Sequence, residues 1–268
     1  MAETMKTGSS AVQAELWSPK ARDWADVQEA TVRPLYDTVF QRLGVGSGTQ
    51  LLDVGCGSGL ALAIAEDLSA TVSGLDATPA LAAIARNRLK RGKVEVGEME
   101  DLPYADQAFD AVTGFNAFQY AASPVRALGE ARRVVRIGGS VVIAVWGTPE
   151  ETDASAYIKA LGSLLPPPPA GAPGPFALSA DGSLERLVTE AGFESVETGS
   201  ESCPWAYPDL EAALRGLLSA GPAVRAIRHA GEEPVRDAVS QAIAPFKLPS
   251  GSYLMQNRFR FAIAKRAS

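Results

Sequence analysis

Short β-branched runs alternate with alanine- and leucine-rich stretches from about residue 49 to residue 146. This alternation predicts repeated strand–helix units on a parallel sheet. The first strand, residues 49–54, is apolar enough to be buried on both faces. Further strands are predicted at residues 71–75, 93–96, 109–113 and 140–146. The helices between them are predicted at residues 60–68, from residue 79 onward, and at 124–135.

The rhythm changes after residue 146. The later pattern predicts helices at residues 150–165 and 181–191, strands at 193–198 and 253–264, and broken helices over 208–246. Four consecutive prolines within residues 166–175 favour a stiff spacer over a polyproline recognition site. We therefore expect one domain with an N-terminal helical cap at 1–48, a core at 49–147, and at 148–268 a linker, the remaining strands and a helical lid insertion at 208–246.

Composition indicates a soluble globular chain: of 268 residues, 46% are hydrophobic and 21% charged. A net charge of -6 argues against a nucleic acid partner, since phosphate-binding surfaces carry excess Lys and Arg. No apolar run reaches the roughly 18 residues of a membrane span, and residues 1–10 lack the apolar core of a secretory signal. Cys56 and Cys203 are too few for a disulfide framework. We expect a reduced, cytoplasmic protein with a small-molecule substrate and no membrane partner, either a monomer or a homodimer.

His229 is the one histidine of the chain. A Cys/His zinc cluster is excluded on numbers, and we expect no metal site. A Ser/His/Asp triad would have to use this residue.

A glycine-rich turn, residues 55–59, joins the first predicted strand to the following helix. Glycines there let the backbone approach a ligand closely. The spacing differs from a dinucleotide fingerprint, which requires a glycine where Leu60 stands, so a nicotinamide-dependent oxidoreductase is disfavoured. Asp53, two residues before the turn, would repel a pyrophosphate but attract the ammonium and sulfonium groups of S-adenosylmethionine.

Asp76 ends the second predicted strand, 23 residues after Asp53. An acid at roughly 20 residues from a glycine turn reaches the ribose hydroxyls of a nucleoside cofactor. The alternative is that Asp76 caps the helix that begins near Thr78.

Four segments together resemble the class I S-adenosylmethionine-dependent methyltransferases with a methyltransferase 11/25-type core. They are LLDVGCGSG at residues 51–59, GEMEDLPY at 97–104, AFDAV at 108–112 and RRVVRIGG at 132–139, and the match covers roughly residues 40–147. The resemblance implies an α/β, Rossmann-like fold with a seven-stranded, mostly parallel sheet whose last strand is antiparallel, and helices on both faces.

The resemblance also implies which residues hold the cofactor. Asp53 and the turn residues Gly55, Cys56, Gly57 and Gly59 would lie by its methionine end, Asp76 on the ribose, Ala77 beside the adenine, Glu98 and Met99 on the adenine, and Phe115 and Asn116 at the methyl group. Two positions depart from the family pattern: Glu98 replaces the usual Asp, and Ile137 replaces a common proline.

Methyl transfer from a sulfonium needs alignment more than acid–base chemistry. Candidates for a base are His229 and Tyr120, with Tyr36 and Tyr157 as further options, and the alternative for His229 is a helix-end cation. Aromatic and amide side chains near the expected site predict a pocket for a neutral, moderately apolar acceptor. The alternative is that these side chains form the hydrophobic core of the lid. They are Trp17, Trp24, Tyr36, Phe118, Gln119 and Tyr120. We hypothesise a methyltransferase for such an O-, N- or C-acceptor. The alternative is a cofactor-binding scaffold for a non-methylating step such as cyclisation.

Overall fold

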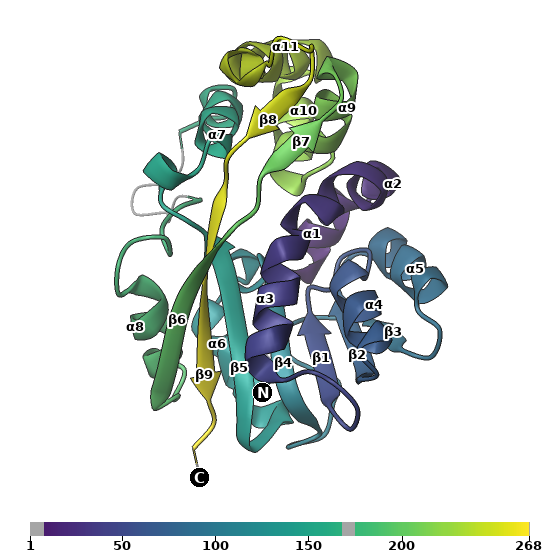
Figure 1. Cartoon of the computed structure of the whole chain (residues 1–268), viewed down its shortest axis with the longest axis vertical. Helices are drawn as coiled ribbons and strands as arrows, with labels where there is room; N and C mark the ends of the chain where they lie inside the picture. Colours follow the sequence, from purple (N-terminus) through teal and green to yellow (C-terminus); the bar gives the residue numbers. More distant parts are fainter. Residues whose placement is uncertain (1–7, 168–174, 268) are drawn as a thin grey trace, which may run out of the picture.

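The computed structural model describes residues 8–167 and 175–267 of the chain. Its centre is a seven-stranded sheet with strand order β3-β2-β1-β4-β5-β9-β6 (Figure 1). The strands are β1 (Gln50–Val54), β2 (Thr71–Asp76), β3 (Lys93–Val96), β4 (Phe109–Phe115), β5 (Val135–Trp146), β6 (Ser195–Ser202) and β9 (Arg258–Lys265). β9 runs antiparallel to both of its neighbours, and the pairs formed by β1 to β5 are parallel. The predicted fold class is confirmed.

Helices cover both faces of this sheet. The core helices are α3 (Arg33–Leu43), α4 (Leu60–Asp67), α5 (Pro79–Arg88), α6 (Pro124–Val134) and α8 (Ser183–Glu190), with a short 3-10 turn η3 (Phe118–Tyr120). Alternation along β1 explains the two layers: Leu51 packs in the core with α3 and α4, whereas Leu52 and Val54 pack in the core with α6 and α8. Over the described ranges, no helix has the length and apolar character to cross a membrane.

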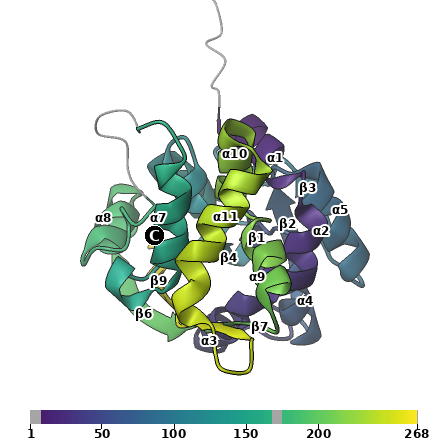
Figure 2. The ribbon, with the colours of Figure 1, turned by 90° about the horizontal axis from the view of Figure 1, so that it is seen from above.

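A second layer of helices stands over the carboxyl ends of the parallel strands (Figure 2). The N-terminal cap contributes α1 (Ser10–Trp17), α2 (Ala21–Asp23), a π-helix η1 (Trp24–Gln28) and a 3-10 helix η2 (Glu29–Val32). Later segments contribute η4 (Pro149–Glu151), α7 (Ala154–Ser163), α9 (Leu210–Leu217), α10 (Gly221–Ala230), α11 (Glu232–Ile243) and η5 (Ala244–Phe246).

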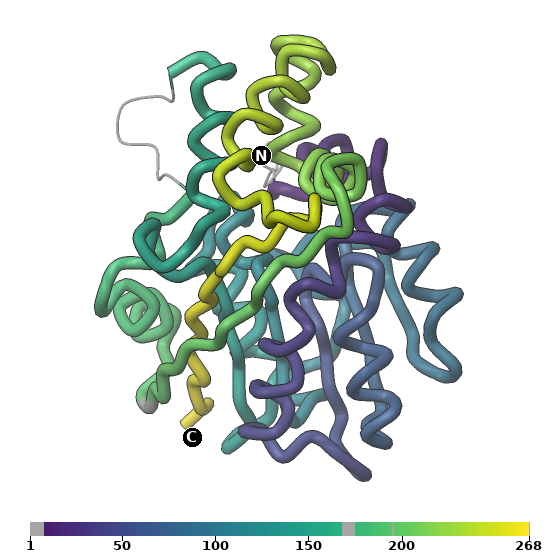
Figure 3. The backbone as a smooth tube through the Cα atoms, turned by 45° about the horizontal axis from the view of Figure 1, so that its top comes forward, coloured from purple at the N-terminus to yellow at the C-terminus, as the bar shows by residue number. Residues whose placement is uncertain are grey.

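A two-stranded arm carries the late helices above the sheet. The path of β6 continues into β7 (Trp205–Tyr207), and β8 (Tyr253–Met255) continues into β9 (Figure 3). β7 and β8 pair with each other, apart from the main sheet. The insertion α9 to α11 lies between them in the sequence, so the arm fixes its place over the site.

The structure differs from the predicted elements in several places: the helix predicted at 150–165 is the separate η4 and α7, and β6 covers Ser195–Ser202 instead of 193–198. The last strand, predicted over residues 253–264, is divided at Asn257, whose buried side-chain Oδ1 accepts from the Ala154 amide at 2.9 Å. β5 begins at Val135 instead of 140 and includes Gly138, because a register shift against β4 accommodates the glycine pair. β7 was not predicted, because three residues are too few to show a period. The proline-rich segment was interpreted over residues 166–175, of which 168–174 lie outside the described residues.

Candidate functional site

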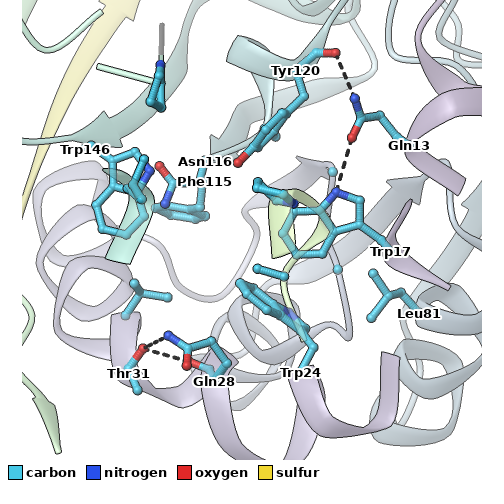
Figure 4. A pocket seen from close by; sticks show the side chains of 18 of the residues that line it. Gln13, Trp17, Trp24, Gln28, Thr31, Leu81, Phe115, Asn116, Tyr120 and Trp146 are labelled. Carbon is cyan, nitrogen blue, oxygen red and sulfur yellow. Dashed lines mark hydrogen bonds between the residues drawn. The ribbon is translucent and has the colours of Figure 1, made fainter. Parts of the chain in front are cut away.

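A cavity of about 340 Å³ lies between the carboxyl ends of the strands and the upper helical layer. Its walls come from the cap, the glycine turn, the ends of β2, β4 and β5, α7, and the segment joining α9 to α10. Figure 4 shows the part of the lining that comes from the cap and from the ends of β4 and β5. This is the edge at which open α/β sheets bind ligands.

The glycine turn adopts backbone angles that other residues avoid. Gly55, Gly57 and Gly59 have φ of +72°, +55° and +82°. A Cβ on Gly55 would lie 2.5 Å from the Ala117 Cβ, and one on Gly59 would lie 2.8 Å from the Ala85 Cβ. Close packing and left-handed backbone therefore both require glycine at these two positions.

Asp76 braces this turn and lines the cavity. Its Oδ2 accepts from the Gly57 amide at 2.8 Å, and its Oδ1 accepts from the Thr78 amide at 2.7 Å. The second bond braces Thr78, the N-cap residue of α5, and α5 has no side-chain cap bond, so Asp76 does not cap the helix in the way proposed as the alternative. Each oxygen keeps a second lone pair, so the same carboxylate retains acceptor capacity for ribose hydroxyls. Burial raises the pKa of Asp76.

Asp53 lies beneath the turn, 2% exposed and outside the cavity lining. Thr113 Oγ1 donates to its Oδ1 at 2.7 Å. Desolvation raises the pKa of Asp53 to about 8, against the opposing effect of the Thr113 bond, and the negative charges of Glu29 and Asp76 add to the rise. A cation bound near the turn would relieve this concentration of acids.

Aromatic rings of the cap and of β4 close the cavity over the turn. The Trp17 ring meets the Trp24 ring edge-to-face at 4.9 Å and the Tyr120 ring at 6.1 Å. Tyr36 meets Phe115 at 4.6 Å in the same manner. The Trp17 indole donates to Gln13 Oε1 at 3.2 Å, a bond drawn in Figure 4.

The opposite end of the cavity is built from residues that the sequence analysis did not propose for the acceptor pocket, although Tyr157 was named there as a candidate base. Trp146 stacks on Phe259 at 4.7 Å, with an interplanar angle of 27°, and meets Trp205 at 5.5 Å. Tyr157 and Leu161 of α7 complete this wall, and the Tyr157 hydroxyl donates to the Leu217 carbonyl at 2.7 Å. Only Trp146 offered a signal, since it ends a strand at the ligand-binding edge. Phe259 faces Trp146 across the β5–β9 pair of the main sheet, and Trp205 belongs to the arm, so both depend on contacts between distant segments.

The structure divides the predicted cofactor residues into two groups. Those lining the cavity are Gly55, Gly57, Asp76, Ala77, Met99, Phe115 and Asn116. Those outside its lining are Asp53, Cys56, Gly59 and Glu98. Glu98 instead accepts from the Ser10 amide at 2.8 Å and from the Glu100 amide at 3.1 Å, so it holds the first turn of α1. Asn116 lines the cavity with φ of +51°, an uncommon backbone angle for a residue other than glycine.

The predicted substrate residues also divide. The cavity lining includes Trp17, Trp24, Tyr36 and Tyr120. Phe118 and Gln119 lie outside it: Phe118 is fully buried in the core with α6 because its ring packs on Gly114, and Gln119 donates to Asn116 Oδ1 at 3.3 Å.

Neither His229 nor Tyr120 is placed or protonated as a base would be: His229 lies away from the cavity, and Tyr120 keeps its proton. His229 is exposed in the last turn of α10 and does not line the cavity. Tyr120 does line it, but burial raises the pKa of Tyr120 to about 12, so its phenol stays protonated at neutral pH.

These groups fit a cationic nucleoside cofactor. Gly55 and Gly57 of the glycine turn line the cavity, and Asp76 offers acceptors at the sugar position. Met99 and Leu81 give the apolar surface that an adenine ring requires. Asp76 at the cavity, with Asp53 beneath the turn able to give up its proton, suits a sulfonium and an ammonium and would oppose a pyrophosphate.

Comparisons with known proteins agree with this geometry. A family model described as "Methyltransferase domain" matches residues 52–143. The chain is 33% identical over 205 residues to malonyl-[acyl-carrier protein] O-methyltransferase of Geobacter sulfurreducens, and the match covers 74% of each chain. It is 33% identical over 126 residues to demethylmenaquinone methyltransferase of Tropheryma whipplei, with coverage of 46% of this chain and 53% of that protein.

The fold has solved counterparts as well. The crystal structure of the [4+2]-cyclase SpnF superposes with a TM-score of 0.55 at 21% identity, covering 87% of this chain and 81% of that one. At this identity the likeness concerns the fold alone.

Proposed function

Because this chain belongs to the class I S-adenosylmethionine-dependent methyltransferases, we propose that it methylates a small, neutral and fairly apolar metabolite. One observation carries the proposal about the acceptor. Among the described residues that line the cavity, the single charged side chain is Asp76, at the glycine turn. The remaining walls are aromatic, aliphatic or uncharged polar groups.

The two relatives act on acceptors of different chemistry. A malonyl group carries a carboxylate, whereas demethylmenaquinone is a neutral quinone. Burying a carboxylate requires a cation or several donors, and no Lys, Arg or His belongs to the part of the lining that the structure describes. The lining therefore supports a neutral acceptor over an acidic one, and leaves oxygen, nitrogen and carbon open as the acceptor atom.

The chain's own residues mainly bind, orient and exclude water. S-adenosylmethionine supplies a methyl group already activated by its sulfonium. Asp76 and the glycine turn hold the cofactor end, while Trp146, Trp205 and Phe259 give an acceptor a dry, rigid wall. Such alignment is worth roughly 7–11 kcal/mol of a barrier. Burial keeps the phenol of Tyr120 protonated, so it is a hydrogen-bond donor in this mechanism.

Tryptophan fluorescence should report on both ends of the cavity. The chain has four tryptophans, and all four line the cavity: Trp17, Trp24, Trp146 and Trp205. We expect saturable quenching by a neutral naphthoquinone and at least about tenfold weaker binding of its carboxylated analogue, because the carboxylate finds no cation. The variant W146F should lose part of the quinone response and keep the response to S-adenosylhomocysteine. Equal affinity for the acid would contradict the proposed acceptor class.

Cofactor binding should release protons. The pKa of Asp53 in the folded chain is about 8, above its ordinary 3.8. Protonation of Asp53 therefore stabilises the folded, cofactor-free protein. This stabilisation is fully present below pH 3.8 and is lost as the pH rises through about 8. A bound cation lowers the pKa of Asp53, so near pH 7 the carboxyl gives up its proton.

Calorimetry in two buffers of different ionisation enthalpy measures this release. S-adenosylmethionine should release more protons than S-adenosylhomocysteine, which lacks the sulfonium charge. The variant D53N should remove most of that difference between the two ligands. If D53N releases as many protons as the unmodified protein, Asp53 is not the group that responds.

The alternative function is a cofactor-binding scaffold for a step such as cyclisation, favoured only by the fold likeness to SpnF. The two functions differ in cofactor consumption. A methyltransferase converts one S-adenosylmethionine to S-adenosylhomocysteine for each product molecule, whereas a scaffold leaves the cofactor unchanged. Chromatography of both nucleosides during turnover separates them.

A further inference from the structure

Glu29 is a buried acid in the cap to which neither the sequence motifs nor the proposed function gives a role. It is the first residue of η2, directly after the π-helix η1, and is 3% exposed. An acidic side chain is rarely buried to this degree unless its charge is paired. Its partners all belong to the cofactor-binding core.

Three core groups donate to the Glu29 carboxylate. Ser58 of the glycine turn donates its hydroxyl to Oε2, and the Arg88 guanidinium at the end of α5 donates to the same oxygen. The amide of Leu60, the first residue of α4, lies 3.4 Å from Oε1. One carboxylate from the cap therefore joins the turn, the helix that follows it and α5.

The contact extends to the middle of the turn. A Cβ built on Gly57 would lie 3.4 Å from Glu29 Oε1 and 3.6 Å from the Trp24 indole nitrogen. Glu29 and Trp24 thus lie directly over the glycine whose amide bonds to Asp76. A change in the position of η2 would therefore alter the contacts of the glycine turn, which lines the cofactor end of the cavity.

The same short segment also builds the acceptor side. Trp24 and Gln28, the first and last residues of the π-helix, both line the cavity. The Tyr207 hydroxyl of β7 donates to Gln28 Oε1 at 2.7 Å, and this bond is buried. Gln28 directly precedes Glu29 in the sequence. π-helical turns are rare and often occur at functional sites.

Surface ion pairs link the cap to the late helices. Lys20 pairs with Glu232 at 2.8 Å, and Arg215 pairs with Asp23 at 2.6 Å. Exposed pairs of this kind contribute little to docking. Among the described residues, the buried bonds of Glu29 are therefore the strongest polar link between the cap and the glycine turn.

We propose that Glu29 is a positioning residue that fastens the N-terminal cap to the glycine turn, so that cofactor binding and closure of the cap over the cavity are one coupled event. The proposal concerns the cofactor end of the site and holds whichever acceptor the enzyme uses. Glu29 acts through Ser58, Leu60 and Arg88.

The variant E29A tests this coupling, with E15A as the matched control, since Glu15 is an exposed cap acid paired with Arg228. Two readouts are needed: the Kd for S-adenosylhomocysteine by calorimetry, and hydrogen exchange of residues 21–43 and 55–60 with and without that ligand. In the unmodified protein and in E15A, the ligand should slow exchange in both segments. In E29A the Kd should rise at least about tenfold, and protection should be confined to residues 55–60.

A purely structural role would lower the melting temperature of E29A but leave the Kd and the ligand-induced protection of the cap unchanged, and that result overturns the proposal. If E29A does not fold, the variant S58A tests the proposal instead. It removes one donor and leaves the Glu29–Arg88 pair, so the Kd should rise about threefold with reduced protection of residues 21–43. If S58A has the same Kd and the same ligand-induced protection as the unmodified protein, the proposal is also overturned.

Discussion

Replacing Asp76 by alanine should weaken binding of S-adenosylmethionine and S-adenosylhomocysteine by at least about 3 kcal/mol, roughly a hundredfold or more in Kd. The carboxylate would accept from the ribose, and it also holds the amides of Gly57 and Thr78. Its loss removes charge-assisted hydrogen bonds and leaves two amides beside the cofactor without their acceptor. The effect is therefore larger than the loss of a single ribose contact.

Calorimetric titration measures the change, and Asp67→Ala is the matched control. Asp67 is exposed and pairs with Lys90 at 2.8 Å, away from the cavity. The control should bind both ligands as the unmodified protein does. An unchanged Kd in Asp76→Ala would contradict the assignment of Asp76 to the cofactor.

Replacing Gly55 by alanine should destabilise the fold by about 2–5 kcal/mol and abolish cofactor binding. A left-handed backbone costs about 1–2 kcal/mol for a residue with a Cβ, and overpacking costs about 1–3 kcal/mol more. Both penalties apply, because φ is +72° and the new Cβ would lie 2.5 Å from the Ala117 Cβ. Urea unfolding with and without S-adenosylhomocysteine measures both effects.

Gly129 provides the contrast within the same chain. It lies inside α6, and a Cβ there meets nothing within 4 Å outside its own helix. Gly129→Ala should stabilise the protein by about 0.5–1 kcal/mol. If Gly55→Ala were as stable as Gly129→Ala, the close packing described for the glycine turn would be wrong.

The order of the core elements could be predicted because each has a local cause. Leu51, Leu52 and Val54 are apolar on both faces of a buried strand, and Ser123 followed by Pro124 marks a helix start, where the Ser123 hydroxyl accepts from the Arg126 amide. The positions of Asp53 and Asp76 at the ends of the first two strands could be predicted for the same reason, although only Asp76 lines the cavity. Strand ends meet at one edge of a parallel sheet, so position along the chain gives position in space.

The acceptor end could not be predicted, because it depends on contacts between distant segments. Trp146 and Phe259 meet through the pairing of β5 with β9, and Trp205 joins them from β7 of the arm. Glu29 gave no signal either, since no local pattern indicates a π-helix or places an acid over a glycine turn. Arg88 ends α5, where a cation favours the helix C-terminus, and nothing local shows that the structure also pairs it with Glu29.

Transfer of a labelled methyl group tests the central claim most directly. The purified protein is incubated with methyl-labelled S-adenosylmethionine and an extract of its source cell, and products are identified by mass spectrometry after separation into neutral apolar, acidic and macromolecular fractions. The account predicts a labelled, neutral, apolar product that the Asp76→Ala variant does not form. Label confined to an acidic or macromolecular product would contradict the proposed acceptor, and cofactor binding with no labelled product from any fraction would contradict methyl transfer itself.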